Sequence, residues 1–136
     1  MKKRILYLKE TIFEANSYTT NGIIPIFSLR NEISKLAIAH LFTIDGYRYA
    51  IKHVLPFKNK IPIYYSNNTL LFYIKSKADE KYFINYFEIF KICYNNKILI
   101  LFKSGEQLEL NISKKMIENE LKKINTLLNY LNNLLW

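Results

Sequence analysis

The sequence predicts an α+β fold: an antiparallel β-sheet or partly open barrel of about six to eight short strands, with one long C-terminal α-helix packed on it. Two observations support this prediction. From Lys60 to Ser113, short runs rich in Ile, Tyr, Phe and Leu alternate with Asn, Ser, Lys and Gly, as in successive strands joined by turns. After Ser113, apolar residues recur at spacings of four and three, which is typical of a helix.

The 136 residues contain no evident linker or internal repeat, so we expect a single domain over 1–136. Residues 1–21 are predicted to be a peripheral N-terminal segment, in which 4–13 form one or two short strands and 16–22 a turn-rich link. Residues 22–29 predict an edge strand, because Pro25 cannot donate a ladder hydrogen bond. Residues 30–42 fit either a helix or a strand from Leu36 onward.

Turn residues divide the middle of the chain. The Asp45-Gly46 pair lies between apolar runs and predicts a hairpin of strands 41–44 and 47–55. Further turns are expected at Ser66-Asn67-Asn68, Asn95-Asn96 and Ser104-Gly105. They separate strands predicted over residues 61–65, 70–75, 82–93, 98–103 and 107–112.

The C-terminal helix is predicted over 113–135, with Ser113 able to cap its first turn. Its heptad-spaced apolar stripe could pack on the sheet or form a dimer seam. Met116, Leu127 and Leu134 make the stripe wider than a two-helix seam requires, which favours packing on the sheet. The possible seam residues are Ile117, Leu121, Ile124, Leu128, Leu131 and Leu135.

Composition and motifs argue against several classes of protein. No apolar run approaches the roughly 20 residues of a membrane span, and charge returns at Lys9 and Glu10 after the basic start. We therefore expect a cytoplasmic protein without a membrane partner. Cys93 is the only cysteine, and His40 and His53 lie in separate segments, so no metal site is expected. No nucleophile or phosphate-loop motif occurs. We therefore expect neither an enzyme nor a cofactor or small-molecule substrate.

Charge is distributed unevenly along this chain of formal net charge +9. Between Asp45 and Asp79 there is no acidic residue, yet seven basic or histidine residues occur. Such a window suits a surface that binds a polyanion, although a solvated face of a lysine-rich protein is an equal alternative. The candidate DNA-binding residues are Arg48, Lys52, Lys58, Lys60, Lys75 and Lys77.

Aromatic residues are interleaved with these cations, at Tyr64-Tyr65 and Phe72-Tyr73. Exposed aromatic rings among basic groups are typical of nucleic-acid surfaces. Because neighbours on a strand face opposite ways, we expect one residue of each pair to point outward, and Tyr73 rather than Phe72 in the second pair. Ordinary alternation around a core is the alternative interpretation.

The segment 60–113 resembles the ComK competence transcription factor family. The family's K-x-P-I segment corresponds to Lys60–Ile63, its W-I-N segment to Phe83-Ile84-Asn85, and its I-x-F-x-N-G hairpin to Ile100–Gly105. The matching positions also include Phe42, Gly46, Tyr47, Arg48, Leu71, Phe72, Ser76, Leu108, Leu110 and Ser113. The family's Pro-Thr is Tyr73-Ile74 here, and its Trp is Phe83.

This resemblance implies a cytoplasmic transcriptional activator of competence that binds paired AT-rich boxes in double-stranded DNA. Binding is expected chiefly through the minor groove, as a homodimer or higher homo-oligomer. The runs 82–90 and 103–113 also resemble the LytTR DNA-binding domain, which has a different fold and the same class of partner. The alternative is a basic protein-interaction module, such as a mobile-element factor that binds an acidic partner without sequence-specific DNA binding.

Overall fold

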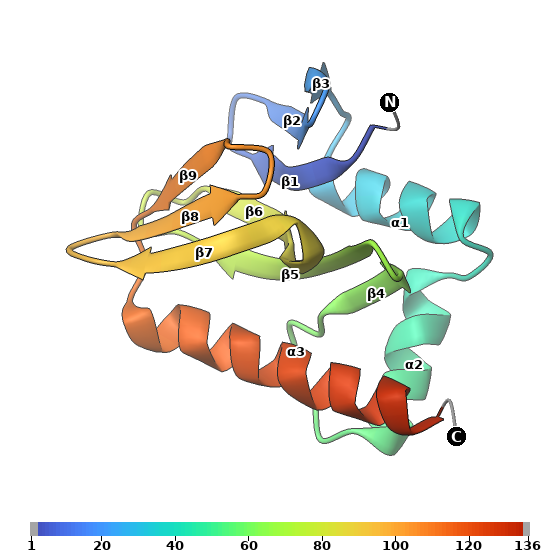
Figure 1. The fold of residues 1–136 in the computed structure, drawn as a ribbon. Helices are drawn as coiled ribbons and strands as arrows, with labels where there is room; N and C mark the ends of the chain where they lie inside the picture. Colours follow the sequence, from blue (N-terminus) through green and yellow to red (C-terminus); the bar gives the residue numbers. More distant parts are fainter. Residues whose placement is uncertain (1–2, 135–136) are drawn as a thin grey trace.

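The computed structural model describes residues 3–134, which form two antiparallel sheets and three α-helices (Figure 1). The strands are β1 (Ile5–Glu10), β2 (Ala15–Thr19), β3 (Gly22–Pro25), β4 (Ile63–Ser66), β5 (Thr69–Lys75), β6 (Lys81–Asn85), β7 (Ile89–Tyr94), β8 (Ile98–Phe102) and β9 (Gln107–Leu110). The helices are α1 (Leu29–Ala39), α2 (Ile44–Val54) and α3 (Lys114–Leu134), with a short 3-10 helix η1 (Tyr86–Glu88). The α+β class is confirmed, and the sheets do not close into a barrel.

The larger sheet has six strands in the order β3-β2-β1-β6-β5-β4, and the smaller has the order β7-β8-β9. One face of the larger sheet packs against the smaller sheet and α3, in a core that includes Phe72 and Ile84. Its other face packs against α1, in a second core that includes Leu71 and Phe83. Successive residues of β5 and β6 thus enter opposite cores, as the pleat of a strand requires.

The N-terminal residues differ from the expectation of a peripheral segment. Strand β1 lies between β2 and β6 inside the larger sheet, and Leu6 and Leu8 are fully buried. The expected link over 16–22 is largely β2. Strand β3 is the edge strand that Pro25 predicted.

Residues 30–39 are helical rather than extended, and residues 40–42 form the turn after the helix. Ser28 caps α1 by accepting a hydrogen bond from the Asn31 N–H at 3.0 Å, and the Glu10 carboxylate accepts one from the Leu29 N–H at 3.0 Å. Ile33 and Ala37, one turn apart, are buried against the sheet. A capped amphipathic helix therefore covers this face.

The hairpin predicted at Asp45-Gly46 is wrong, because these residues begin α2. The Thr43 hydroxyl accepts a hydrogen bond from the Gly46 N–H at 3.1 Å, which satisfies a donor of the first helical turn. A Cβ on Gly46 would lie 2.9 Å from the Thr43 hydroxyl oxygen. Because Gly46 has no Cβ, the Thr43 hydroxyl can approach its N–H closely and cap α2. The hairpin prediction assigned this glycine to a turn between two strands.

The later hairpins are confirmed: β4 pairs with β5, β7 with β8, and β8 with β9, all antiparallel. The run predicted as one strand over 82–93 is divided into β6 and β7 by η1. Asn85 lies at this junction and is fully buried. Its amide bridges β1, the β4–β5 turn, β5 and η1.

Helix α3 packs on the molecule's own sheets. The Ser113 hydroxyl caps it by accepting from the Met116 N–H at 3.1 Å. Ile117, Ile124 and Leu127 are fully buried. Half-buried positions against the same core are Leu121, Leu128 and Leu131, whereas Leu135 lies outside the described residues. The favoured interpretation, a stripe that packs on the sheet, is confirmed for these positions, whereas Leu134 at the end of the helix is exposed.

Within residues 3–134, no helix combines the length and hydropathy that a bilayer span requires.

Candidate nucleic-acid interface

Four of the six predicted DNA-binding residues meet at one surface depression. Arg48 and Lys52 project from α2, and Lys58 and Lys60 from the loop between α2 and β4. With Asn59 and Ile61 they line a depression of about 240 Å³, here called the basic hollow. None of these lining residues, all within the described chain, is acidic. The hollow therefore concentrates positive charge without internal neutralisation.

The cations of α2 face outward because the opposite side of the helix is apolar. Ile44 and Ile51 are buried, while Arg48 and Lys52, one turn apart, are exposed. The Tyr47 hydroxyl donates to the Pro62 carbonyl at 2.7 Å and accepts from the Tyr64 N–H at 3.1 Å. Burial raises the pKa of Tyr47 to about 12, so its hydroxyl stays protonated at neutral pH and ties α2 to the start of β4.

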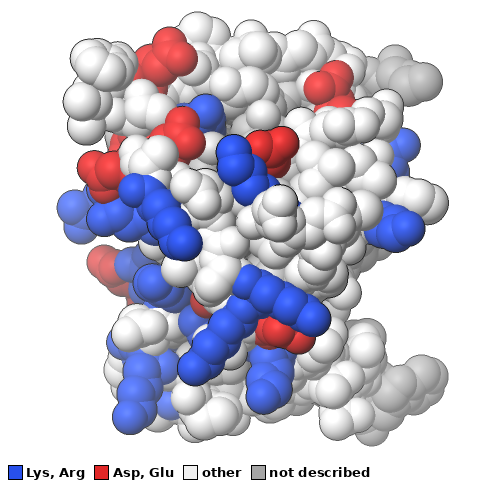
Figure 2. All heavy atoms as spheres, turned by 90° about the vertical axis from the view of Figure 1, so that its left-hand side faces the viewer, with Lys and Arg blue, Asp and Glu red and all other residues white. Residues whose placement is uncertain are grey.

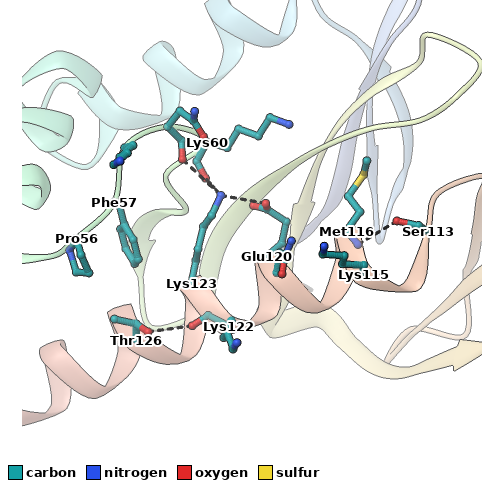
Figure 3. Close-up of a pocket in the computed structure, with 13 residues that line it drawn as sticks. Pro56, Phe57, Lys60, Ser113, Lys115, Met116, Glu120, Lys122, Lys123 and Thr126 are labelled. Carbon is teal, nitrogen blue, oxygen red and sulfur yellow. Dashed lines mark hydrogen bonds and ion pairs between the residues drawn. The ribbon is translucent and has the colours of Figure 1, made fainter.

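The loop that carries Lys58 and Lys60 also contacts α3. The Lys123 ammonium lies 3.4 Å from each of the Asn59 and Lys60 carbonyl oxygens, and 3.0 Å from the Glu120 Oε2 (Figure 3). These residues line a groove of about 720 Å³ between the loop and the first half of α3, here called the α3 groove. Further lining residues include Lys115 and Lys122. The groove thus extends the basic surface beyond the hollow.

Glu120 is an unusual group in this basic setting. Its side chain is only 6% exposed, and within residues 3–134 its Oε1 has no hydrogen-bond partner. Burial raises the pKa of Glu120 above its ordinary value, an effect that the adjacent Lys123 ammonium partly opposes. Burial thus destabilises the ionised carboxylate of Glu120, and the Lys123 ammonium stabilises it.

A second depression adjoins the basic hollow and shares Arg48 and Lys60 with it. This apolar-floored hollow, of about 340 Å³, gains two further cations, Arg30 from α1 and Lys81 from β6, and one carboxylate, Glu10 from β1. The buried apolar residues in its lining are Leu29, Ile33, Ile61 and Phe83. Sequence reasoning missed Arg30 and Lys81 because both lie outside the acid-free window, and only packing brings them beside Arg48.

Lys75 and Lys77 do not line either hollow. Lys75 forms an ion pair with Asp79 at 3.2 Å and lies opposite Lys81 in the β5–β6 register. Lys77 is exposed, and its backbone N–H donates to the Asn111 carbonyl at 3.2 Å. The acid-free window is therefore continuous in sequence but divided in space.

The aromatic pairs contribute mainly to the cores. Tyr65 and Phe72 are buried, and Tyr64 is half-buried with its ring at 6.2 Å from that of Phe87. Tyr73 is partly exposed, as expected, and lines the apolar-floored hollow. Tyr64 and Tyr73 are thus the less buried members of their pairs, and both rings are half-buried against the two cores.

The histidines have local partners. The Nδ1 of His40 lies 2.8 Å from the Leu36 carbonyl oxygen, and that of His53 lies 2.8 Å from the Tyr49 carbonyl oxygen. Within residues 3–134, no group of three or more His, Cys, Asp or Glu side chains is arranged to hold a metal ion.

Charge is more mixed on the face drawn in Figure 2. Figure 2 shows Lys and Arg gathered over the left and lower parts of this face, with Asp and Glu side chains among them. The basic hollow differs from this face in having an acid-free lining. Four cations, Arg48, Lys52, Lys58 and Lys60, thus meet in the basic hollow without an acidic residue in its lining.

Comparison with known proteins identifies the family of this chain. The family model described as ComK protein matches residues 36–133, more than half of the chain. No curated protein and no solved structure matches.

Proposed function

Because the chain belongs to the ComK family of competence regulators, we propose that it binds AT-rich double-stranded DNA through the basic hollow. In this proposal it is a cytoplasmic activator that works as a homo-oligomer and reads DNA chiefly in the minor groove. A narrow A-tract groove concentrates negative potential and attracts Arg and Lys side chains. Arg48 is suited to enter the groove, while the neighbouring lysines contact the flanking phosphates.

The observation that supports this proposal is the convergence of four cations from two separate elements on an acid-free hollow. Each phosphate neutralised contributes about −0.9 to the slope of log affinity against log salt concentration on duplex DNA. Three lysine contacts to phosphate, with Arg48 in the groove, therefore predict a slope of about −2.7 per protein copy. Lys75 and Lys77 remain candidate contacts at a separate part of the surface.

Fluorescence anisotropy tests the proposal with AT-rich and GC-rich duplexes of equal length over a range of KCl concentrations. We expect a preference for AT-rich DNA and a steep salt dependence. The double variant Lys58→Gln/Lys60→Gln should flatten the slope by about 1.8. The matched control is Lys91→Gln/Lys103→Gln, which removes the same charge from β7 and from the turn between β8 and β9. Folded protein that fails to bind AT-rich duplex at low salt would refute the proposal, and equal losses in both double variants would refute the assignment of contacts.

The apolar-floored hollow supports a second candidate function, binding of an acidic protein partner. Its buried apolar lining could receive a side chain while Arg30, Arg48, Lys60 and Lys81 pair with carboxylates around it. Folded protein that shows no affinity for any duplex at low salt, yet binds an acidic peptide bearing one aromatic residue, would favour this function over DNA binding.

A further inference from the structure

The loop between α2 and β4 carries Lys58 and Lys60 and has an unfavourable backbone conformation at Lys60. Residues 56–62 form no helix or strand, and Lys60 has a φ of +50°. This left-handed region disfavours residues that have a Cβ atom. The carbonyls of Asn59 and Lys60 both approach one ammonium group, that of Lys123 on α3. An external contact therefore accompanies the unfavourable backbone geometry.

The ammonium of Lys123 has one acceptor for each of its hydrogen-bond donors in this arrangement. Its ammonium has three donors and three acceptors within reach, the two loop carbonyls and the Glu120 Oε2. Its side chain is 24% exposed. The buried Glu120 carboxylate holds the ammonium from the side of α3, so that Lys123 points at the loop in Figure 3. A lysine engaged in this way differs from the exposed lysines of the basic hollow.

We propose that Lys123, oriented by Glu120, is a positioning residue for DNA binding: it gathers the Asn59 and Lys60 carbonyls and thereby directs Lys58 and Lys60 toward the DNA. This inference rests on the proposed function. Without the ammonium, two carbonyl oxygens and a carboxylate would converge with no cation between them. The loop would relax from its left-handed turn, and the two lysines would lose a fixed position relative to Arg48 and Lys52.

The test uses Lys123→Met, which keeps an apolar stem and removes the three donors. The matched control is Lys122→Met, which removes the same charge from an adjacent, exposed residue of the α3 groove. We expect Lys123→Met to weaken binding to AT-rich duplex by about fivefold to tenfold, a coupling typical of groups in one local structure. Lys122→Met should have a clearly smaller effect. Equal losses in the two variants would overturn the proposal, because they would show that only net charge matters.

A double-mutant cycle separates positioning from direct contact with DNA. In a Lys58→Gln/Lys60→Gln background, a positioning residue has little left to position, so adding Lys123→Met should change affinity by less than about twofold. A full additional loss in that background would show that Lys123 acts independently of the loop, and would overturn the proposal.

A measurement without DNA distinguishes failure of this inference from failure of the proposed function. Amide NMR spectra should show shifts at Asn59, Lys60 and Ile61 in Lys123→Met that are absent from Lys122→Met, with the rest of the spectrum retained. Unchanged loop amides would refute the positioning role even if DNA binds. Shifted loop amides in a protein that binds no DNA would instead refute only the proposed function.

Discussion

Replacing Asn85 with Ala should destabilise the fold severely, because one side chain joins four separate segments. The Asn85 Nδ2 donates to the Ile5 carbonyl at 2.9 Å and to the Asn68 carbonyl at 3.2 Å. Its Oδ1 accepts from the Leu70 N–H at 3.1 Å and from the Phe87 N–H at 3.3 Å. The side chain is fully buried, so solvent cannot readily replace these bonds.

The expected magnitude follows from the four bonds. Each intramolecular hydrogen bond contributes about 1 kcal/mol net, and an unpaired buried group costs about 1–3 kcal/mol. Asn85→Ala should therefore lower the free energy of unfolding by about 4 kcal/mol, the sum for four hydrogen bonds. The full cost of four unpaired groups is not reached, because the surrounding backbone relaxes in part. For a chain of this size the expected loss corresponds to a fall in Tm of about 15 °C. The loss is a large share of the roughly 5–15 kcal/mol that stabilises a typical domain.

Urea unfolding followed by circular dichroism measures this effect. The conservative variant Asn85→Asp keeps the acceptor for Leu70 and Phe87 but opposes a carboxylate to the Ile5 and Asn68 carbonyls, so it should also be strongly destabilised near neutral pH. The control Asn96→Ala, at an exposed turn position between β7 and β8, should stay within about 0.5 kcal/mol of the parent. A loss below about 1 kcal/mol in Asn85→Ala would refute the reasoning that this network joins the segments.

Two further predictions concern α2 and α3. Gly46→Ala should weaken both DNA binding and the stability of the fold, because its Cβ would lie 2.9 Å from the Thr43 hydroxyl oxygen. The double variant Thr43→Ala/Gly46→Ala should relieve this clash but still lack the hydrogen bond that caps α2. A Gly46→Ala variant with unchanged DNA binding and stability would contradict this prediction. Burial raises the pKa of Glu120 above its ordinary value of 4.5, so its stabilising contribution is complete below that value and is lost as the pH rises through the pKa of the folded state. Urea unfolding between pH 4 and pH 7 should therefore show Glu120→Gln gaining stability relative to the parent with rising pH, and a difference that does not change with pH would contradict the shift.

Turn residues in the sequence correctly predicted the hairpins of the second half of the chain, because a tight turn depends only on a few adjacent residues. The turn at Ser66-Asn67-Asn68 lies between alternating strands, and Gly105 takes a φ of +96° in the β8–β9 turn. The Asp45-Gly46 prediction failed because the pair is equally compatible with the first turn of a helix. Thr43 could have signalled the cap, since it precedes apolar residues at helical spacing, at Ile44, Tyr47 and Ile51.

The candidate site could be predicted only where its residues share a segment. The acid-free window identified the four cations of the basic hollow, because α2 and the following loop are adjacent in the chain. Arg30 and Lys81 join the neighbouring hollow through the packing of α1 and β6, which no spacing in the sequence reveals. The window also includes Lys75, which lies outside both hollows and pairs with Asp79, and which stays a predicted contact.

The surroundings of the basic hollow are held by contacts from α2 and α3, as the proposed DNA interface would require if it is arranged before binding. The loop is held near its end by the Tyr47 hydroxyl on α2 and in its middle by Lys123 on α3. Helix α3 is itself fixed by Ile117 and Ile124, which are fully buried in the same core as β5 and β8. Because the loop is already ordered in the folded protein, binding loses less conformational entropy. More of the favourable electrostatic energy then contributes to affinity. The apolar stripe of α3 thus serves the interface indirectly: by packing on the sheets rather than on a partner, it places Lys123 against the loop that carries the proposed contacts.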